Sequence, residues 1–265
     1  MDTLESLNRV IVSCTKCERL VRYREQVAMR KVRRFRDCEY WARPVPGFGD
    51  VNARLLIIGL APAAHGANRT GRMFTGDSSG SWLMRALHET GFANKPASIS
   101  RDDGLTLRDA YITAVLRCAP PDNRPTREEI GNCVQYLINE VRLLRRVRIV
   151  LTLGSIAFNA YCRMSGVTGL EFRHGACYEV WDDDYYGDDD YDKNGDKDGS
   201  SNSSSRSSNS SRRSRRSRRR GRMITLIASY HPSRQNTQTG RLSWGMWIDV
   251  FRRIRLMLDG SELKP

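Results

Sequence analysis

The sequence predicts an α/β fold: a three-layer α/β/α sandwich around a central, mainly parallel sheet of four strands. Two observations predict it. Short apolar runs, of the kind that form buried parallel strands, recur along the chain and alternate with stretches of helical periodicity. A glycine ends two of these runs, at Gly59 and Gly154, and a helical pattern follows each. Strands that alternate with helices form a parallel sheet with helices on both faces.

The expected elements follow in order along the chain. Helical patterns precede the sheet at residues 3–12 and at residues 19–36, the second with eight Lys or Arg. The four strands are expected at residues 54–59, 110–116, 147–153 and 223–229, with helices between them at residues 82–91, 126–145 and 155–163. A last helix is expected over residues 244–258, where Trp247, Val250, Phe251, Ile254 and Leu258 share one face.

The connection after the first strand is the most informative segment. Residues 59–80 read GLAPAAHGANRTGRMFTGDSSG, several times longer than the roughly two to six residues of most βα loops. Its small residues let backbone N–H groups approach a flat or anionic ligand, and Ser78 and Ser79 are expected to cap the next helix. A second polar segment, residues 231–236, follows the fourth strand. Because carboxyl ends of parallel strands share one edge, Asp77 and His231 should converge on a ligand site there.

The cysteines predict a metal site. Cys14 and Cys17 form a close pair, and Cys118 and Cys133 form a wide pair about a hundred residues later. Such pairs can gather four thiolates around one zinc ion or one iron–sulfur cluster, and the spacing does not choose between the two. The other three, Cys38, Cys162 and Cys177, are expected to be packing or surface thiols.

Residues 182–222 differ in composition from the rest of the chain. They are first acidic, then rich in Ser and Asn, and end in RRSRRSRRRGR. Such a stretch cannot offset its ordering entropy, so we expect a disordered insertion within one domain spanning residues 1–265. It contains 11 Lys or Arg and nine Asp, so nearly all of the net charge of +14 belongs to the rest of the chain. That charge favours nucleic acid as the partner over a generically basic protein.

The sequence shows no targeting segment. The amino-terminal residues are amphipathic and acidic rather than typical of a signal peptide, and no apolar run approaches the roughly 18 residues of a membrane helix. We therefore expect a cytoplasmic monomer, neither secreted nor bound to a membrane, whose thiols stay reduced.

Five separated motifs, in order, resemble the uracil-DNA glycosylase superfamily, in particular its family 5, the iron–sulfur type. They are VPGFG at residues 45–49, GLAPA at 59–63, RCAPPDNRP at 117–125, HPS at 231–233, and the four cysteines, two before GLAPA and two after it. Only residues 182–222 fall outside the family pattern. The resemblance implies the family's fold, a [4Fe–4S] cluster on the four cysteines, and hydrolysis of the N-glycosidic bond of deaminated bases in double-stranded DNA, which leaves an abasic site.

The resemblance also implies roles for individual residues. Asp77, the carboxylate after FTG, would orient water or stabilise the cationic sugar, and His231 would donate a hydrogen bond to the departing base. Phe74 would stack on the flipped base, and Asn123 is a candidate to read its edge. The pocket would also include Gly59, Leu60 and Ala61, and DNA contacts are expected at Ser79, Ser233, Arg234 and Asn236. Residues 233–239 would wedge the groove, residues 79–80 would bind a phosphate, and the basic segment 19–36 would hold the DNA backbone in the nucleoid.

Two alternatives stay open. A non-enzymatic nucleic-acid-binding protein with an iron–sulfur or zinc centre would have no need for His231 opposite a glycine-rich pocket. A strictly uracil-specific enzyme of family 4 would carry GEAPG where this chain has GLAPA. Since Ala61 cannot aim a polar group at the attacking water, we expect a wider range of bases that includes hypoxanthine or xanthine.

Overall fold

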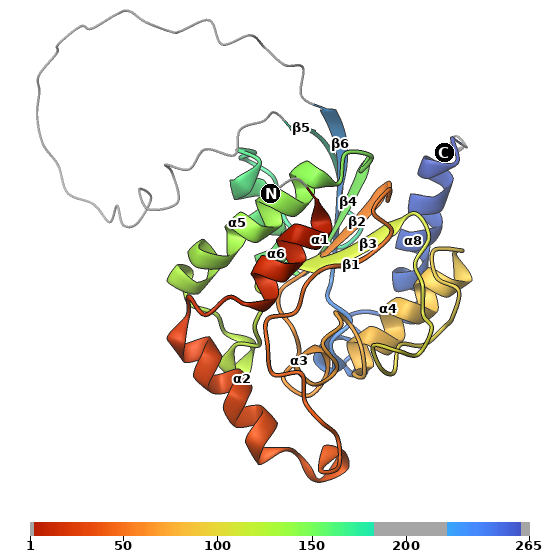
Figure 1. Cartoon of the computed structure of the whole chain (residues 1–265). Coiled ribbons are helices and arrows are strands. Elements are labelled where there is room, and N and C mark those ends of the chain that lie inside the picture. Colours follow the sequence, from red (N-terminus) through yellow and green to blue (C-terminus); the bar gives the residue numbers. More distant parts are fainter. Residues whose placement is uncertain (1–2, 183–221, 261–265) are drawn as a thin grey trace, which may run out of the picture.

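The centre of the fold is one six-stranded sheet with the order β1-β3-β2-β4-β6-β5 (Figure 1). The structure, a computed structural model, describes residues 3–182 and 222–260. The strands are β1 (Phe48–Gly49), β2 (Leu55–Gly59), β3 (Ala110–Ala114), β4 (Ile149–Leu153), β5 (Cys177–Asp182) and β6 (Arg222–Ser229). The helices are α1 (Leu4–Val12), α2 (Glu18–Arg30), α3 (Ala67–Thr70), α4 (Ser78–Glu89), α5 (Arg127–Leu143), α6 (Ser155–Met164), α7 (Arg234–Gln238) and α8 (Trp244–Leu258), with short 3₁₀ turns η1 (Arg33–Phe35) and η2 (Pro121–Asn123).

The four expected strands form the inner part of the sheet. β3, β2, β4 and β6 pair in parallel, as predicted. The prediction of a four-stranded sheet is wrong by two edge strands, because β1 pairs with β3 and β5 pairs with β6, both antiparallel. β1 is only two residues long, and β5 reads CYEVWD with two acidic residues among its six, so neither has the continuous apolar run of a central strand.

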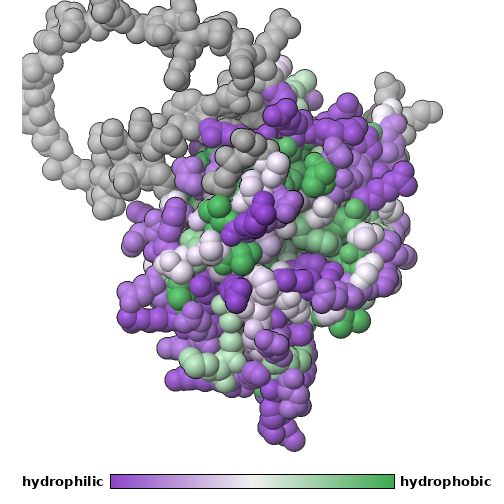
Figure 2. Space-filling view, viewed as in Figure 1, coloured by the Kyte–Doolittle hydropathy of each residue, from purple (hydrophilic) through white to green (hydrophobic). Residues whose placement is uncertain are grey.

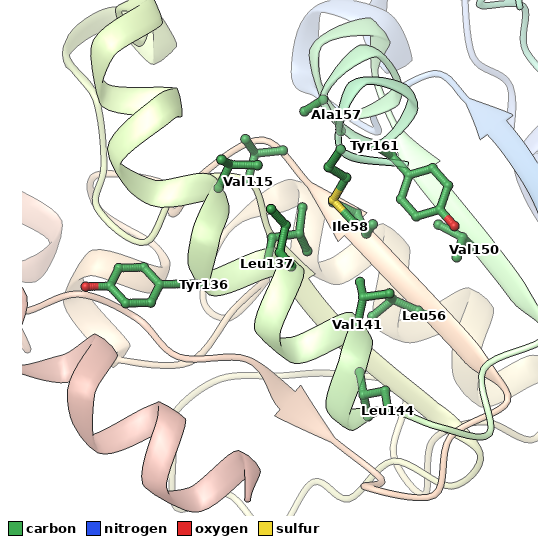
Figure 3. Close-up of a cluster of buried hydrophobic side chains, with 14 of the residues drawn as sticks. Leu56, Ile58, Val115, Tyr136, Leu137, Val141, Leu144, Val150, Ala157 and Tyr161 are labelled. Carbon is green, nitrogen blue, oxygen red and sulfur yellow. The ribbon is translucent and has the colours of Figure 1, made fainter. Parts of the chain in front are cut away.

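Helices cover both faces of the sheet, which confirms the three-layer architecture. Successive residues of a strand point to opposite faces. Leu56, Ile58 and Val150 pack on one face with α1, α5 and α6 (Figure 3), whereas Leu55, Ile57 and Leu151 pack on the other with α4 and α8. Two capping boxes, from Thr3 on α1 and from Thr126 on α5, fix the starts of helices on the first face.

Several expected boundaries differ from the structure by a few residues. The helix expected over residues 19–36 ends at Arg30, because Lys31 adopts φ +23° and a 3₁₀ turn follows. The expected insertion is shorter at both ends, since Asp182 and Arg222 are paired residues of β5 and β6. Its remainder, residues 183–221, lies outside the described residues. Within the part of the chain that is described, no helix is long and apolar enough to cross a membrane.

Candidate active site

An open pocket of about 970 Å³ lies beyond the carboxyl end of β2. Its walls come from four separate parts of the described chain: residues 63–66 and 76–81 of the long loop, residues 32–35 after α2, residues 97–99, and residues 120–123. Tyr23, Arg69 and Arg234 complete the lining. The pocket therefore forms at the edge where the sequence predicts a ligand site.

Asp77 lines this pocket and caps α4. Its Oδ1 accepts the backbone N–H of Gly80 at 2.8 Å, so the expected caps Ser78 and Ser79 are wrong by one or two residues: Asp77 is the N-cap. Three cap-forming residues follow one another in this sequence, and only the geometry of the turn selects among them. The carboxylate also fits against Gly66, where a Cβ would lie 2.2 Å from Asp77 Oδ2.

The charge state of Asp77 reflects opposing influences. Burial raises the pKa of its carboxyl above the ordinary value, although the N–H groups of Gly80 and Ser79 and the nearby cations Arg69 and Arg234 act in the opposite direction. The result is a partly buried carboxylate, held by backbone dipoles, that faces a solvent-filled pocket. Such a group can orient water or stabilise a developing cation.

His231, Phe74 and Gly59 form a second group at the same edge. The rings of Phe74 and His231 lie 5.9 Å apart between centroids and are tilted by 32°. A Cβ on Gly59 would lie only 2.9 Å from the Phe74 ring, so glycine is required beneath that ring. Phe74 itself adopts φ +50°, a left-handed conformation that is rare for an aromatic residue and is found at functional sites.

His231 is a neutral imidazole near pH 7. Burial lowers its pKa to about 4. The Asn236 side chain holds the backbone of His231 in place, because its amide N–H donates to the His231 carbonyl oxygen at 2.8 Å. Among the described residues, no partner hydrogen-bonds the ring nitrogens of His231, so its N–H group can donate to a ligand.

The remaining expected site residues differ in how they are placed. Asn123 is exposed and lines the pocket, as does Arg234. Leu60 and Ala61 are half-buried against the core beside β2. Ser233 caps α7 through the N–H of Asn236, so its hydroxyl is already engaged, as is the Asn236 side chain. The N–H group of Gly80 donates to Asp77, so it is not available to the phosphate that was expected at residues 79–80. The Ser79 hydroxyl remains as a donor there.

Two residues that the sequence reading missed support the site. Arg69, on α3, stacks on Phe35 with 3.9 Å between its guanidinium carbon and the ring centroid, and it donates to the carbonyl of His65. It places a cation beside Asp77. His174 accepts the N–H of Tyr230 through Nδ1 at 3.2 Å and stacks on the Tyr230 ring. Arg69 could have been suspected from its place in the long loop, within the sequence HGANR, whereas no sequence pattern indicated His174.

The four cysteines of the expected metal site lie together. Cys14, Cys17, Cys118 and Cys133 line one small cavity between α2, the end of β3 and α5. No group of three or more His, Cys, Asp or Glu side chains in the described residues has the arrangement to hold a metal ion. A single zinc ion needs all its sulfurs about 2.3 Å from one point, whereas a cluster has several metal atoms and holds its cysteines further apart.

The surroundings of the four cysteines suit an anionic group. Arg24 is 4% exposed, donates to Cys118 Sγ at 3.0 Å, and has a second buried nitrogen, Nε, without a partner. The backbone N–H of Arg117 donates to Cys133 Sγ at 3.2 Å, and the Asn132 side chain donates to Cys17 Sγ at 3.6 Å. Burial raises the pKa of Cys118 to about 11 and that of Cys133 to about 12. Metal binding displaces the proton of a thiol, because the thiolate is the form that ligates the metal.

Comparison with known proteins agrees with this geometry. The model of the uracil DNA glycosylase superfamily matches residues 46–251. A type-5 uracil-DNA glycosylase of Thermus thermophilus is 44% identical over 93% of this chain and 94% of its own length, and one of Pyrobaculum aerophilum is 41% identical over 92% and 88%. A type-4 enzyme of Pyrobaculum aerophilum is 31% identical over 66% of this chain. The chain belongs to the uracil-DNA glycosylase superfamily, and within it to the type-5 family.

Proposed function

We propose that this protein hydrolyses the N-glycosidic bond of uracil in double-stranded DNA and leaves an abasic site. The observation that carries the proposal is the Asp77 carboxylate, partly buried yet facing an open pocket, with the neutral donor His231 at the same edge of the sheet. The relatives named type-5 uracil-DNA glycosylases support uracil as the base.

Hydrolysis of the glycosidic bond requires the site to stabilise two opposite charges. As the glycosidic bond breaks, the sugar gains positive charge and the base gains negative charge. Asp77 stabilises the sugar cation or orients the water that attacks it. His231 donates its N–H to a carbonyl oxygen of the departing base, because a neutral imidazole keeps one N–H group as a donor.

Phe74 and Asn123 select the base. The Phe74 ring offers a face on which a flipped base stacks, and the Asn123 amide can read the edge of that base from the pocket wall. Gly59 keeps the loop backbone close to this ring, and Leu60 and Ala61 bring no polar group to the site. We propose that the absence of a polar side chain at Ala61 widens the range of bases to include hypoxanthine or xanthine.

Arginines around the pocket bind the DNA backbone. Arg34 and Arg69 both stack on Phe35, and these two residues and Arg234 line the pocket. Figure 2 shows hydrophilic side chains over the part of the molecule where Figure 1 places α2. Contacts between these arginines and phosphates release counterions, so we expect binding to weaken steeply as salt rises.

We also propose that Cys14, Cys17, Cys118 and Cys133 hold a [4Fe–4S] cluster. Its role is structural, because hydrolysis transfers no electrons. The fit is supported by the four sulfurs around one cavity, by the three N–H donors to those sulfurs and by the unpaired Arg24 nitrogen. The residues join the end of α1, the start of α2, the end of β3 and α5.

Single-turnover excision from duplexes that carry uracil, hypoxanthine or xanthine tests the function. We expect excision of uracil, and excision of at least one purine if the range is wide. Excision of uracil alone would support family-4-like specificity. Tight binding without release of any base would support the rival function, a non-enzymatic nucleic-acid-binding protein.

A further inference from the structure

Asn68 is a buried amide that joins the active-site loop to α2. It lies on α3, within the long loop after β2, and is 1% exposed. Its Nδ2 donates to two backbone carbonyl oxygens at 3.3 Å each, that of Arg24 in α2 and that of Ala64 in the loop. Its Oδ1 is buried and has no hydrogen-bond partner among the described residues. A buried polar atom without a partner costs free energy, so packing alone would favour an apolar side chain here.

On the loop side, Asn68 belongs to the segment that faces the Asp77 carboxylate. Its backbone N–H donates to the carbonyl oxygen of Ala63 at 3.0 Å. Gly66 of the same segment lies so close to the carboxylate that a Cβ there would be 2.2 Å from Asp77 Oδ2. Arg69, the next residue after Asn68, is the cation beside Asp77. A shift of this segment therefore moves both a contact surface and a neighbouring charge of the carboxylate.

On the α2 side, Arg24 reaches the four cysteines. It is 4% exposed, and its Nη1 donates to Cys118 Sγ at 3.0 Å and to the carbonyl oxygen of Cys14 at 3.4 Å. No carboxylate of the described residues forms an ion pair with it. A buried cation without an anion is costly, so Arg24 gains a partner when thiolates hold a cluster. Because the carbonyl oxygen of the same residue accepts from Asn68, Arg24 joins the cysteines to the active-site loop.

α2 has few other attachments to the fold. Of its 13 residues, Leu20 is the one buried apolar residue. Its ion pair between Arg19 and Glu129 involves an arginine side chain that is 44% exposed. A helix with so little buried apolar surface opens at a low free-energy cost. Coupling between two sites needs such an element, whose position both sites influence.

α3 has a second attachment, which does not involve α2. The carbonyl oxygens of Asn68 and Arg69 accept the backbone N–H groups of Ala42 and Trp41, at 3.0 Å and 2.9 Å. These bonds hold α3 from the other side when α2 opens. The loop is then displaced rather than unfolded.

We propose that Asn68 is a positioning residue that makes the placement of Asp77 depend on the cluster. The proposal rests on the proposed function and on the proposed cluster. With the cluster bound, Arg24 holds α2 in place and Asn68 holds the loop against α2, side by side as in Figure 1. When the cluster is lost, α2 opens and the loop loses this anchor. The excision rate then falls, although every residue that contacts the substrate is still present.

Asn68→Ala in the iron-containing protein separates the link from the cluster. No hydrogen bond joins Asn68 to the four cysteines in the described part of the chain, so this variant should keep its iron. We expect its saturated single-turnover rate to fall about 10- to 100-fold, the effect of a misplaced catalytic group, with little change in DNA affinity. A residue with a purely structural role would lower the stability in urea and leave the rate of the folded enzyme unchanged.

Ser165→Ala is the matched control for a lost buried hydrogen bond. Ser165 is 5% exposed, and its hydroxyl donates to the carbonyl oxygen of Tyr161 at 2.7 Å. It follows the last residue of α6, a helix that begins at the carboxyl end of β4 and leads away from that edge. Ser165→Ala should lose stability and keep the excision rate. A full rate in folded, iron-containing Asn68→Ala would overturn the proposal.

Backbone amide exchange tests the link without excision and without any change at Asn68. In Cys118→Ser, without iron, we expect exchange of residues 63–70 to accelerate together with that of α2, and in Cys177→Ser we expect neither. In Asn68→Ala, residues 63–70 should exchange faster while α2 stays protected. Unchanged protection of residues 63–70 in Cys118→Ser, or a parent protein that binds no cluster, would overturn the proposal. If the parent released no base, the proposed function would fail, and the exchange comparison would still decide the link.

Discussion

Asp77 combines two tasks that pull its charge in opposite directions. As the N-cap of α4 it is stabilised as an anion by helix N–H groups, whereas burial in the pocket wall favours the neutral acid. The raised pKa shows that burial has the larger effect. A carboxylate in this state is poorly solvated, so it gains more from a cation that forms nearby than an exposed carboxylate does.

Asp77→Asn and Asp77→Ala separate the two tasks. Asn remains a good N-cap, so Asp77→Asn should keep the stability of the parent within about 0.5 kcal/mol, whereas Asp77→Ala should lose about 1 kcal/mol. Both should slow single-turnover excision by about 10²-fold or more, because both remove the charge. Urea unfolding and excision assays provide the two measurements. A fast Asp77→Asn enzyme would remove the carboxylate from the chemistry.

His231 should make the stability of the protein depend on pH. The pKa of His231 is about 4 in the folded state and near 6.5 in the unfolded state. Between these two pH values the unfolded chain binds a proton at His231 and the folded chain does not. The free energy of unfolding should therefore fall as pH drops from about 6.5 to about 4. His231→Asn should lose less stability than the parent between pH 7 and pH 5 in urea titrations, and parallel losses would show that other groups cause the effect.

His231→Ala also tests the chemistry directly. Loss of the donor to the leaving base should slow single-turnover excision by about 10²-fold at pH 7. Binding to uracil-containing duplex should change little, because the donor acts mainly as charge develops on the base. An unchanged rate would exclude His231 from the mechanism.

His174 positions the residue before His231. Its Nδ1 accepts from the Tyr230 N–H, so Nε2 carries the proton and donates to the carbonyl oxygen of Met246, at 3.2 Å. His174→Ala should therefore lower the excision rate by about 10- to 100-fold, the effect of a misplaced catalytic group, with little change in DNA affinity. His88→Ala, in an exposed position at the far end of α4, is the control. A loss of affinity without a loss of rate would contradict a positioning role.

At the scale of elements, α2 is held by few buried residues. Only Leu20 and Arg24 of its 13 residues are buried, which is little apolar contact for a helix of this length. Its attachments include the hydrogen bond of Arg24 to Cys118 and the ion pair of Arg19 with Glu129. A cluster on the four sulfurs would join the start of α2 to the sheet.

Loss of one cluster ligand should release α2 before it unfolds the core. Protein prepared without oxygen should be brown and hold about four irons per chain. In Cys118→Ser we expect iron to be lost and backbone amide exchange to accelerate in α2, while α4 and α8 stay protected. Cys177→Ser, outside the cluster, is the matched control. Stoichiometric zinc in place of iron, or uniform protection in Cys118→Ser, would contradict the assignment.

Whether an element could be predicted from the sequence depends on what kind of element it is. The inner strands were predictable because a strand buried on both faces must be apolar throughout, as Leu55–Gly59 is. The edge strands and the end of α2 depend on contacts made in space: β1 exists only because Phe48 and Gly49 pair with β3. That the four cysteines lie together could be predicted, because a close pair and a wide pair of cysteines are typical of one metal site. The contacts of Arg69 with Phe35 and of His174 with Tyr230 could not be predicted in this way, because each joins residues far apart in the chain.

At the scale of the whole molecule, the pairing of β5 with β6 shows where the chain can be shortened. Asp182 and Arg222 are Cα partners, so the two strands already approach as closely as the ends of a hairpin. A tight turn can join strands with this spacing. The 39 residues between them, 183–221, therefore need not contribute to the sheet for the strands to meet.

Replacement of residues 183–221 by a short Asn-Gly turn should preserve the fold and the saturated rate of excision. The replaced stretch contains ten Lys or Arg and eight Asp, so its net charge is small, although its arginines are concentrated in the last part of its sequence, where we expect them to contact DNA phosphates. We therefore expect at most about tenfold weaker DNA binding at low salt, roughly 1.4 kcal/mol, and a smaller difference at physiological salt, where such contacts are screened. Binding isotherms at two salt concentrations and single-turnover rates at saturating enzyme measure the two quantities. A fall in the saturated rate of a folded, iron-containing variant would mean that residues 183–221 help to build the active site.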